Sequence, residues 1–499
     1  MNQEPCILAL DLGTSSVRAI LYDRLGRPVP EAERQRPYSQ TTTEDGGVET
    51  DPDTLVRLTV ALLKDLTRSL SPDLKKRVRA VAASCFWHSL MGVDADGRAA
   101  TPLYSWADTR AAGAALRLRS EIDPSEYHVR TGCELHPCFW PAKLLWLRET
   151  QPDLSRRVVR WMGFGDYLYL RLFGKAVTSI SMASGTGLYD PNRCEWDEQA
   201  LGLAGVKPSA LPGVVDCDAP LSGLADEFRR ALAPLAGLPW YPAVGDGACS
   251  NIGGGGLDQR TIAFNIGTSA AMRITVEAES TAIVPGLFCY RIDRKRLLTG
   301  GAFATGGNMY AWLEGTLKLD DVHKQVRASA AMQPAAHGLT VLPFWAGERS
   351  PGWHPQAQAA IFGMNLHTTS HDILRASLES AAFLYDIVRR RLAQRFPDAS
   401  TIVATGGALA HDTVWTQILA DVFGAPIETR KVFEASSRGA AILALENLGI
   451  IRSASQITVR KGRVFKPDAG RHEAYAGAAA KFEEMYERHV AGRAPHKEG

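Results

Sequence analysis

One short phrase occurs twice in this chain, and it strongly constrains the fold. Near the N-terminus the sequence is Ile7-Leu-Ala-Leu-Asp-Leu-Gly-Thr-Ser-Ser-Val-Arg18, and far downstream it is Ile262-Ala-Phe-Asn-Ile-Gly-Thr-Ser269. An apolar run that stops at Gly and hydroxyl residues indicates a strand entering a tight turn. Such a turn presents N–H groups and hydroxyls that suit phosphate oxygens. The first copy carries Asp11, which can hold a cation, and the second carries the neutral Asn265. Two such turns predict two related halves that face one nucleotide.

The size and composition of the chain narrow its class. A chain of 499 residues is too long for one hydrophobic core, so we expect two or more domains. An apolar content of 45%, a charged content of 22% and a net charge of +2 are ordinary for a soluble globular protein, and they favour neither a nucleic-acid partner nor an anionic membrane. The eight cysteines show no zinc spacing. We see no signal peptide and no apolar run of ~18 residues, so we expect a cytoplasmic location.

Strand and helix patterns alternate along both halves. We expect strands within 7–22, 78–85, 261–276 and 401–404, and helices at 141–149, 160–173, 371–394 and 412–423. A Pro-rich segment at 211–242 looks like the connection between the halves. The alternation predicts an α/β fold with a mixed sheet and helices on its faces. The long repeat indicates a duplicated domain with a cleft between the copies.

Asp246 is the candidate general base. It lies between Gly245 and Gly247, and these glycines leave the carboxylate uncrowded and let a substrate approach. An N-cap of a helix is the structural alternative, because Asp is a favoured cap, and the two roles can coexist. In phosphoryl transfer to a hydroxyl, a carboxylate positions the nucleophile and accepts its proton.

Glycine-rich and aromatic segments supply further candidates. Two Gly-Gly pairs would let backbone approach a flat ligand such as a nucleotide, although an ordinary turn explains them as well: Gly306-Gly307 and Gly406-Gly407. Two loops combine aromatic rings with hydrogen-bonding ends, a mixture that suits a polyhydroxylated ligand: Phe86-Trp87-His88-Ser89 and Tyr104-Ser-Trp106-Ala-Asp108-Thr-Arg110. The structural alternatives there are a buried aromatic with a satisfied His and a surface salt bridge.

Several well-known motifs are missing from the sequence. The chain has no G-x-x-x-x-G-K-[ST] phosphate loop and no G-x-S-x-G elbow. It also has no G-x-G-x-x-G after a strand, which disfavours a Rossmann dehydrogenase.

The motifs that are present resemble those of the FGGY carbohydrate kinases, which have the actin/Hsp70/hexokinase-like ATPase fold. Asp11-x-Gly-Thr-x-Ser-x-Arg18 is similar to the family's first phosphate loop. Ala359-Ala-Ile-Phe-Gly-Met364 followed by Asp372-Ile-Leu-Arg-Ala-Ser-Leu-Glu379 is similar to its C-terminal signature, and Lys143-Leu-Leu-Trp146 matches the core of its N-terminal signature. The resemblance covers nearly the whole chain.

Within that family the chain most resembles the gluconokinases. The likeness lies in the segments His88-Ser89, Trp106-Ala-Asp108-x-Arg110, His136-Pro137, Asp246-Gly-x-x-Ser-Asn251 and Ala346-Gly-Glu-Arg349-x-Pro351. Glycerol kinases usually carry Gln after the base and an aromatic residue at the position of Cys138, so Gly247 and Cys138 count against glycerol. Gluconokinases tend to have Asn-rich residues where this chain has Ala304-Thr305. Xylulose or another pentulose is the main rival substrate.

The resemblance implies two RNase H-like α/β domains that close on a cleft. It places a sugar-binding domain at 1–245, a nucleotide-binding domain at 246–485 and a polar tail at 486–499. It implies an ATP- and Mg²⁺-dependent kinase that phosphorylates a primary hydroxyl of a sugar or sugar acid, with D-gluconate converted to 6-phosphogluconate as the best expectation. A non-catalytic sugar sensor and an ATPase acting on protein partners are the alternatives from other classes. The resemblance is compatible with a homodimer.

The resemblance also assigns roles to residues of this chain. Asp11 would lie on the metal side, and Asp246 would take the proton from the attacking hydroxyl. The expected nucleotide contacts are Thr14, Ser15, Ser16, Arg18, Gly267, Thr268, Gly306, Gly307, Gly406 and Gly407. The expected sugar contacts are His88, Trp106, Asp108, Arg110, His136, Asp246 and Gly247. A substrate carboxylate needs a cationic or strong donor partner, for which Arg110, His88 and His136 are the candidates.

Overall fold

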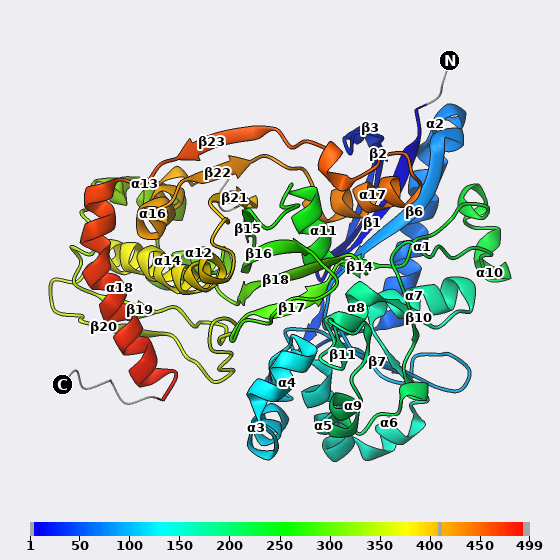
Figure 1. The fold of residues 1–499 in the computed structure, drawn as a ribbon, viewed down its shortest axis with the longest axis horizontal. Coiled ribbons are helices and arrows are strands. Elements are labelled where there is room, and N and C mark those ends of the chain that lie inside the picture. The colour runs from blue at the N-terminus through cyan, green and yellow to red at the C-terminus, as the bar shows by residue number, and fades with distance from the viewer. Residues whose placement is uncertain (1–3, 408–411, 493–499) are drawn as a thin grey trace.

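The computed structural model describes residues 4–407 and 412–492 of the chain. Each half of the sequence builds one large β-sheet, and helices pack against both of these sheets (Figure 1). The first sheet has five strands in the order β14-β6-β1-β2-β3, and the second has seven in the order β17-β18-β16-β15-β21-β22-β23. The second sheet lies at the centre of the view, with the first sheet to one side of it and helices α14, α16 and α18 to the other.

The first half runs from the N-terminus to the last strand of the first sheet. Its strands are β1 (Cys6–Leu12), β2 (Ser16–Asp23), β3 (Pro28–Pro37), β4 (Thr41–Thr42), β5 (Val48–Thr50), β6 (Val78–Cys85), β7 (Met91–Val93), β8 (Leu103–Tyr104), β9 (Arg160–Met162), β10 (Val177–Ser179), β11 (Tyr189–Asp190), β12 (Glu195–Trp196), β13 (Gly213–Val215) and β14 (Val244–Gly245). Its helices are α1 (Pro52–Ser69), α2 (Pro72–Arg77), α3 (Ala112–Glu121), α4 (Pro124–Thr131), α5 (Trp140–Thr150), α6 (Pro152–Arg157), α7 (Phe164–Phe173), α8 (Ile180–Ser184), α9 (Glu198–Ala204) and α10 (Asp226–Arg229).

The second half begins with the helix that carries the candidate base. Its strands are β15 (Thr261–Ile266), β16 (Ala270–Glu277), β17 (Phe288–Arg291), β18 (Arg296–Phe303), β19 (Thr340–Leu342), β20 (Ala360–Phe362), β21 (Thr401–Thr405), β22 (Ile427–Arg430) and β23 (Lys461–Phe465). Its helices are α11 (Asp246–Gly253), α12 (Asn308–Leu317), α13 (Val322–Ala328), α14 (Ser370–Arg395), α16 (Thr413–Phe423), α17 (Ala435–Asn447) and α18 (Ala469–His489).

The two large sheets share one topology. In the first sheet β3, β2 and β1 pair antiparallel in that order, and β6 and β14 continue parallel to β1. The second sheet repeats this pattern with β18, β16, β15, β21 and β22, and it adds β17 and β23 antiparallel at its edges. A shared strand order in two halves confirms the duplicated, mixed α/β fold that the repeated phrase predicts.

The cores of the two halves are joined through helices at the boundary. Helix α17 belongs to the second half of the sequence, but it packs against β1 and β6 of the first sheet and against α11 (Figure 1). The apolar side chains of Ala440–Leu445 therefore belong to the hydrophobic core of the first half. Residues 486–489, which the sequence assigned to a polar tail, instead continue α18, because Tyr486 is buried and donates a hydrogen bond to Glu348.

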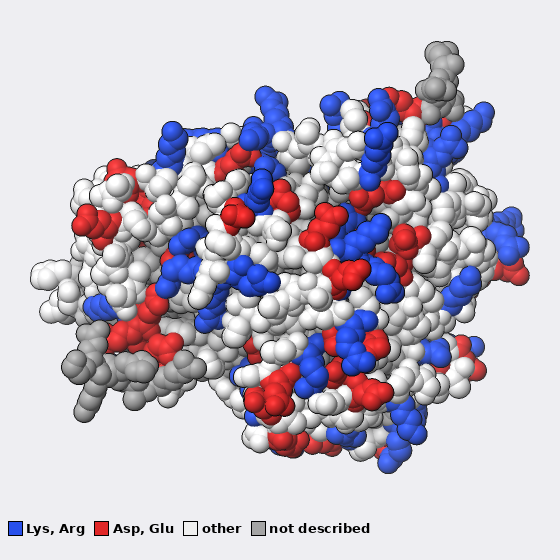
Figure 2. Space-filling model, viewed as in Figure 1, with Lys and Arg blue, Asp and Glu red and all other residues white. Residues whose placement is uncertain are grey.

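The surface carries charges of both signs. On the face drawn in Figure 2, basic and acidic side chains are interspersed rather than gathered into one field. Such a mixed face offers no extended basic track of the kind that binds a phosphate backbone. Among the helices of the described chain, none is both long and apolar enough to cross a membrane.

Candidate active site

The two Gly-Thr-Ser phrases form equivalent turns. The first joins β1 to β2, and the second joins β15 to β16. Asp11 near the end of β1 stands in register with Ser84 of the parallel strand β6, and Asn265 of β15 stands in register with Thr405 of β21. Asn265 also donates a hydrogen bond to the Thr405 hydroxyl at 3.1 Å. Each sheet therefore presents a polar pair beside its turn, one anionic and one neutral.

These turns have unused hydrogen-bond donors. Within the described chain, the backbone N–H groups of Thr14, Ser15, Thr268 and Ser269 donate to no other protein group. The turn after β15 is further held from behind, because Gly307 and Asn308 donate backbone hydrogen bonds to the carbonyls of Gly267 and Thr268, at 2.7 and 3.0 Å. Free N–H groups on a fixed turn are what an anionic oxygen needs.

A cavity of about 660 Å³ lies between the halves, and both turns open into it. It brings together many of the residues expected at the site: Thr14, Ser15, His88, Trp106, His136, Asp246, Gly267 and Thr268. It is also lined by residues that the sequence did not single out as ligands, including Cys138, Ser269, Arg273, Tyr290, Asn308, Glu348 and Arg349. Of the expected contacts, Asp11, Ser16, Arg18, Asp108, Arg110, Gly247 and the two Gly-Gly pairs do not line it.

Asp246 is the first residue of α11, immediately after β14. Glycine on both sides leaves room for Trp87, because a Cβ would lie 1.8 Å from that ring at Gly245 and 2.8 Å from it at Gly247. The Gly247 N–H donates to the Asp246 carboxylate at 2.8 Å. Burial raises the pKa of Asp246, and the positive charge of Arg273 opposes that rise. A carboxylate with a raised pKa is a stronger proton acceptor than an exposed Asp.

Asp11 is a second buried carboxylate close to Asp246. Its oxygen lies 3.8 Å from the guanidinium of Arg18, which forms a closer ion pair with Glu434. Burial, together with the nearby charges of Asp246 and Glu434, raises the pKa of Asp11 to about 7. Ser16 lies in β2, where its hydroxyl is hydrogen-bonded to the Gln35 side chain. Arg18 therefore cross-links the two halves beside the first turn.

Two neutral histidines form part of the wall opposite the turns. His88 has a left-handed backbone conformation, with φ of 67°, and its Nδ1 is hydrogen-bonded to the Gly185 carbonyl at 2.6 Å. His136 accepts a hydrogen bond at Nδ1 from the Cys138 N–H. Burial, together with the charge of Arg349, lowers the pKa of both imidazoles well below the usual range. Both rings are therefore uncharged at neutral pH and serve as hydrogen-bonding groups.

Arg110 and Asp108 lie behind this wall and are already paired. The Arg110 guanidinium donates to Asp108 at 2.5 Å and to Glu49 at 2.8 Å, and it stacks on the Trp146 ring. Asp108 also accepts a hydrogen bond from the Val48 N–H. Both carboxylates together satisfy Arg110, so its role in the structure is to fix the Trp106 loop.

The glycines of the two Gly-Gly pairs differ in how much space surrounds them. A Cβ at Gly306 would lie 2.6 Å from the Ser269 backbone, and one at Gly406, which has φ of 108°, would lie 2.2 Å from the Ile266 carbonyl. These two glycines let other segments pack closely against the second turn. Gly407, in contrast, has open space where a side chain would be.

Two arginines, Arg273 and Arg349, are the basic cavity residues that sequence reasoning missed. Arg273 is on β16, four residues after the Ser269 hydroxyl, and Arg349 is in the Ala346–Pro355 loop. The Ala346–Pro351 segment was noted only for its resemblance to gluconokinases. For Arg349 the available signal was its place inside that segment, whereas Arg273 lies just beyond the second Gly-Thr-Ser phrase.

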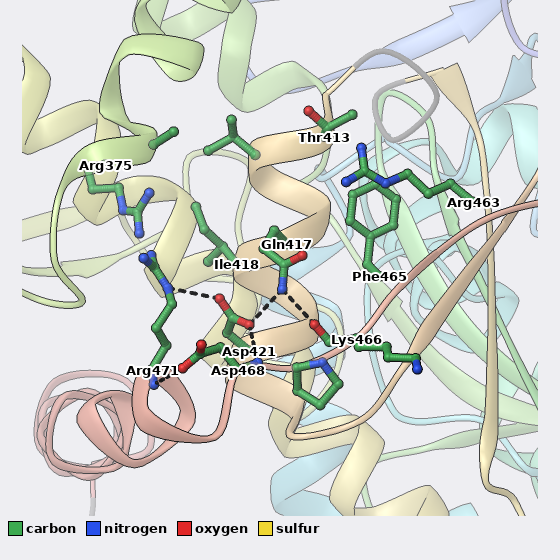
Figure 3. A pocket seen from close by; sticks show the side chains of 13 residues that line it. Arg375, Thr413, Gln417, Ile418, Asp421, Arg463, Phe465, Lys466, Asp468 and Arg471 are labelled. Atoms are coloured by element: carbon green, nitrogen blue, oxygen red, sulfur yellow. Dashed lines mark hydrogen bonds and ion pairs between the residues drawn. The ribbon is translucent and has the colours of Figure 1, made fainter.

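A second hollow, of about 510 Å³, lies beside α16 and the start of α18 (Figure 3). Its central charges are satisfied internally: Asp421 accepts hydrogen bonds from Arg471 at 3.0 Å and from Gln417 at 2.8 Å. Buried Arg375 at its edge is bonded to Glu379 and to the Tyr475 hydroxyl. These pairs hold α16, α18 and the chain before it together, and the side chains of Arg463 and Lys466 also line the hollow.

Comparisons with known proteins agree with this architecture. The N-terminal domain of the FGGY family of carbohydrate kinases matches residues 6–253, and the C-terminal domain of the same family matches residues 262–447. The gluconokinase of Bacillus subtilis is 26% identical over 471 residues, covering 92% of this chain and 91% of that protein. A glycerol kinase of Aromatoleum aromaticum is 30% identical over 480 residues, covering 92% and 94%.

Solved structures give the same result at the level of the whole fold. A ligand-bound xylulose kinase and a gluconate kinase, both from Lactobacillus acidophilus, each match with a TM-score of 0.89 and 27% identity, covering 97% of this chain and 98% of theirs. The likeness to both kinases is equal, so it does not select a substrate. Because the two family domains together span most of the sequence, this chain belongs to the FGGY family of carbohydrate kinases.

Proposed function

We propose that this carbohydrate kinase transfers the γ-phosphoryl group of ATP to a primary hydroxyl of a sugar acid, with D-gluconate giving 6-phosphogluconate. The observation that carries the proposal is that Asp246 lines one cavity together with both Gly-Thr-Ser turns and with the side chains of His88 and Trp106. Phosphoryl transfer requires donors for the phosphates and a carboxylate at the acceptor hydroxyl. The resemblance to gluconokinases supports the choice of acid.

The nucleotide phosphates would bind between the two turns, where Thr14, Ser15, Thr268 and Ser269 offer free N–H groups. Within residues 4–407 and 412–492, no group of three or more His, Cys, Asp or Glu side chains is arranged to hold a metal. Mg²⁺ is commonly held by one or two carboxylates together with substrate phosphates and water. Asp11 fits that requirement, and the metal would neutralise charge on the phosphates.

Asp246 would accept the proton of the substrate's primary hydroxyl as that oxygen attacks the γ-phosphorus. Its raised pKa suits this step, and the positive charge of Arg273 favours the ionised carboxylate. Trp106, His88 and His136 would orient the polyol chain through a ring face and neutral imidazole groups. Closure of the two halves around the substrates would exclude water, which otherwise competes as the phosphoryl acceptor.

The Asp246→Asn variant tests the assignment of the base. The amide keeps the size of the side chain but cannot accept the proton, so we expect kcat to fall by ~10²-fold or more. Nucleotide affinity should stay close to that of the parent protein, because Asp246 does not contact the phosphates. ADP release with Mg²⁺ would be measured on D-gluconate, D-xylulose, D-ribulose and glycerol, and nucleotide binding by calorimetry. Near-normal turnover in a folded variant would remove Asp246 from this role.

A pentulose is the second candidate substrate, favoured by the equal match to the xylulose kinase structure. Turnover on D-xylulose without turnover on D-gluconate would keep the kinase mechanism and replace the substrate. If the protein binds ATP but releases no ADP with any of these sugars, that result would contradict the kinase assignment and favour a sensor.

A further inference from the structure

Two guanidinium groups in the cavity have no protein partner that neutralises them. Arg273 and Arg349 both line it, and the Nε of each is buried without a hydrogen-bond acceptor. In the described part of the chain, neither forms an ion pair with a carboxylate. This contrasts with Arg110 and Arg18 nearby, which are both paired with acids. Buried cations without partners are costly, and a ligand anion would relieve that cost.

Arg349 is held in place by its surroundings. Its guanidinium lies 5.6 Å from the Trp106 ring centroid and 5.5 Å from that of Trp353, and its Nη2 is 3.4 Å from Nε2 of His88. Trp353 is fully buried, so one side of this arrangement is rigid. Aromatic faces orient an Arg without neutralising it. The remaining N–H groups are therefore available to a ligand.

The loop that carries Arg349 is fixed by Glu348. That carboxylate accepts hydrogen bonds from the backbone N–H groups of Gly352 and His354, each at 3.1 Å, and from the Tyr486 hydroxyl at 2.6 Å. Arg119 of the first half donates to the Trp353 carbonyl at 2.6 Å. Glu348 is therefore occupied by its own loop and by α18, and it does not neutralise the arginines.

Arg273 lies beside the base and depends on Gly247 for its space. A Cβ at Gly247 would lie 3.0 Å from its Nη2, so the guanidinium is in close contact with the backbone of the residue that follows the base. Burial lowers the pKa of Arg273 to about 10, which leaves it charged at neutral pH. Among the other charged groups that line the cavity, Asp246 is needed at the hydroxyl and Glu348 is occupied. Arg273 therefore feels the charge of Asp246, but within the described residues neither Arg273 nor Arg349 forms an ion pair, and the Nε of each lacks an acceptor.

We propose that Arg273 and Arg349 together bind the carboxylate of the substrate, so that the enzyme selects sugar acids over neutral polyols and ketoses of similar length. This inference rests on the proposed kinase function of the same cavity and names the residues that set its substrate class. Paired guanidinium groups are well suited to a carboxylate, because they offer parallel N–H donors as well as charge.

The test compares two ligands that differ in one group. D-Gluconate and D-glucitol share the same hydroxylated chain, but D-glucitol has a neutral CH₂OH in place of the carboxylate. Affinity for each would be measured by calorimetry on the full chain, and KM and kcat by ADP release. We expect the parent protein to bind D-gluconate at least ~10-fold more tightly, since a hydrogen bond to a charged group is worth roughly 1.5–3 kcal/mol.

Arg273→Gln and Arg349→Gln would each reduce D-gluconate affinity by about 10- to 100-fold and leave D-glucitol affinity nearly unchanged. Arg273→Lys and Arg349→Lys, which keep the charge, should retain part of the preference, so they serve if a Gln variant fails to fold. Arg98→Gln, at an exposed position away from the cavity, is the matched control.

The possible outcomes separate this inference from the proposed function. A parent-like ratio of D-gluconate to D-glucitol affinity in either Gln variant would overturn the two-arginine site, even if D-gluconate is phosphorylated. Turnover on D-xylulose with no binding of D-gluconate would overturn it as well. Selective, arginine-dependent binding of D-gluconate without turnover would support the carboxylate site and contradict the kinase proposal.

Discussion

The chemistry of the cavity depends on a few charges taken out of water. Asp246, Arg273 and Asp11 lie close enough for each to influence the next, and burial is the largest cause of the pKa shift at all three. Burial disfavours charge, so it raises the pKa of the acids and lowers that of the arginine. Asp246 and Arg273 favour the ionised form of each other, whereas the negative charge of Asp246 disfavours ionisation of Asp11.

This coupling predicts a pH profile for the reaction. Asp246 acts only when deprotonated, and burial raises its pKa, so kcat/KM should fall on the acid side at a higher pH than the 3.8 of an ordinary Asp. Arg273 opposes that rise, so Arg273→Gln should move the acid limb to still higher pH. Profiles of kcat/KM for the parent, Arg273→Gln and Arg98→Gln would measure this. An acid limb that does not move in Arg273→Gln would contradict the coupling.

Asp11 carries a separate prediction for stability. Its folded-state pKa of about 7 exceeds its ordinary value of 3.8, so the folded protein binds a proton that the unfolded chain releases between these values. Without metal and nucleotide, stability should therefore fall as pH rises from about 4 to 7. Asp11→Asn removes this dependence. The difference in free energy of unfolding between the variant and the parent should therefore grow in favour of the variant, by on the order of 2 kcal/mol, as the pH is raised from 5 to 8.

Denaturant unfolding at the two pH values, without ligands, would measure the gain. The same variant should be a poorer enzyme, because it lacks the proposed Mg²⁺ ligand and should need a higher Mg²⁺ concentration for turnover. A variant with parent-like stability at both pH values and parent-like Mg²⁺ dependence would contradict both assignments.

At the scale of elements, local signals were enough for most helices and strands. The predicted strand 78–85 coincides with β6, and the predicted helix 371–394 lies within α14, which starts at a capping box formed by Thr369 and Asp372. The segment 160–173 differs, because Arg160–Met162 pairs with β7 as a strand before α7 begins. That pairing joins residues far apart in sequence, so no local pattern indicates it.

In the site, too, local features could be predicted from the sequence and long-range contacts could not. Motifs located the turns, Asp246 and the aromatic wall, since each consists of neighbouring residues. The pairing of Arg110 with Glu49 and the lack of partners around Arg273 depend on tertiary contacts. Sequence reasoning therefore named an arginine that turns out to be neutralised and overlooked two that are not. Charge alone does not indicate which cation is available to a ligand.

At the scale of the whole molecule, the halves are joined by more than a linker. Buried Arg438 of α17 donates hydrogen bonds to the Gly26 carbonyl of the first half and to the Gly253 carbonyl of α11. A Cβ at Gly439 would lie 1.9 Å from the Cys249 carbonyl, so α17 and α11 are in close backbone contact. The first sheet thus depends on a helix supplied from the far end of the sequence.

This arrangement predicts that the first half does not fold alone. A chain of residues 1–253 contains its whole sheet but lacks α17, so the face of β1 and β6 that α17 covers would be exposed to water. Burial of apolar surface contributes roughly 25 cal/mol per Å². Because the net free energy of unfolding of a protein is small, exposing this face would remove a large fraction of it. We expect this fragment to lack a cooperative thermal transition and to bind a hydrophobic dye.

Co-expression with residues 254–499 should restore both near-ultraviolet circular dichroism and a single cooperative transition, because the missing helix is supplied without a covalent link. A sharp transition in the fragment alone, at a temperature close to that of the full chain, would instead mean that the first sheet is stable without α17.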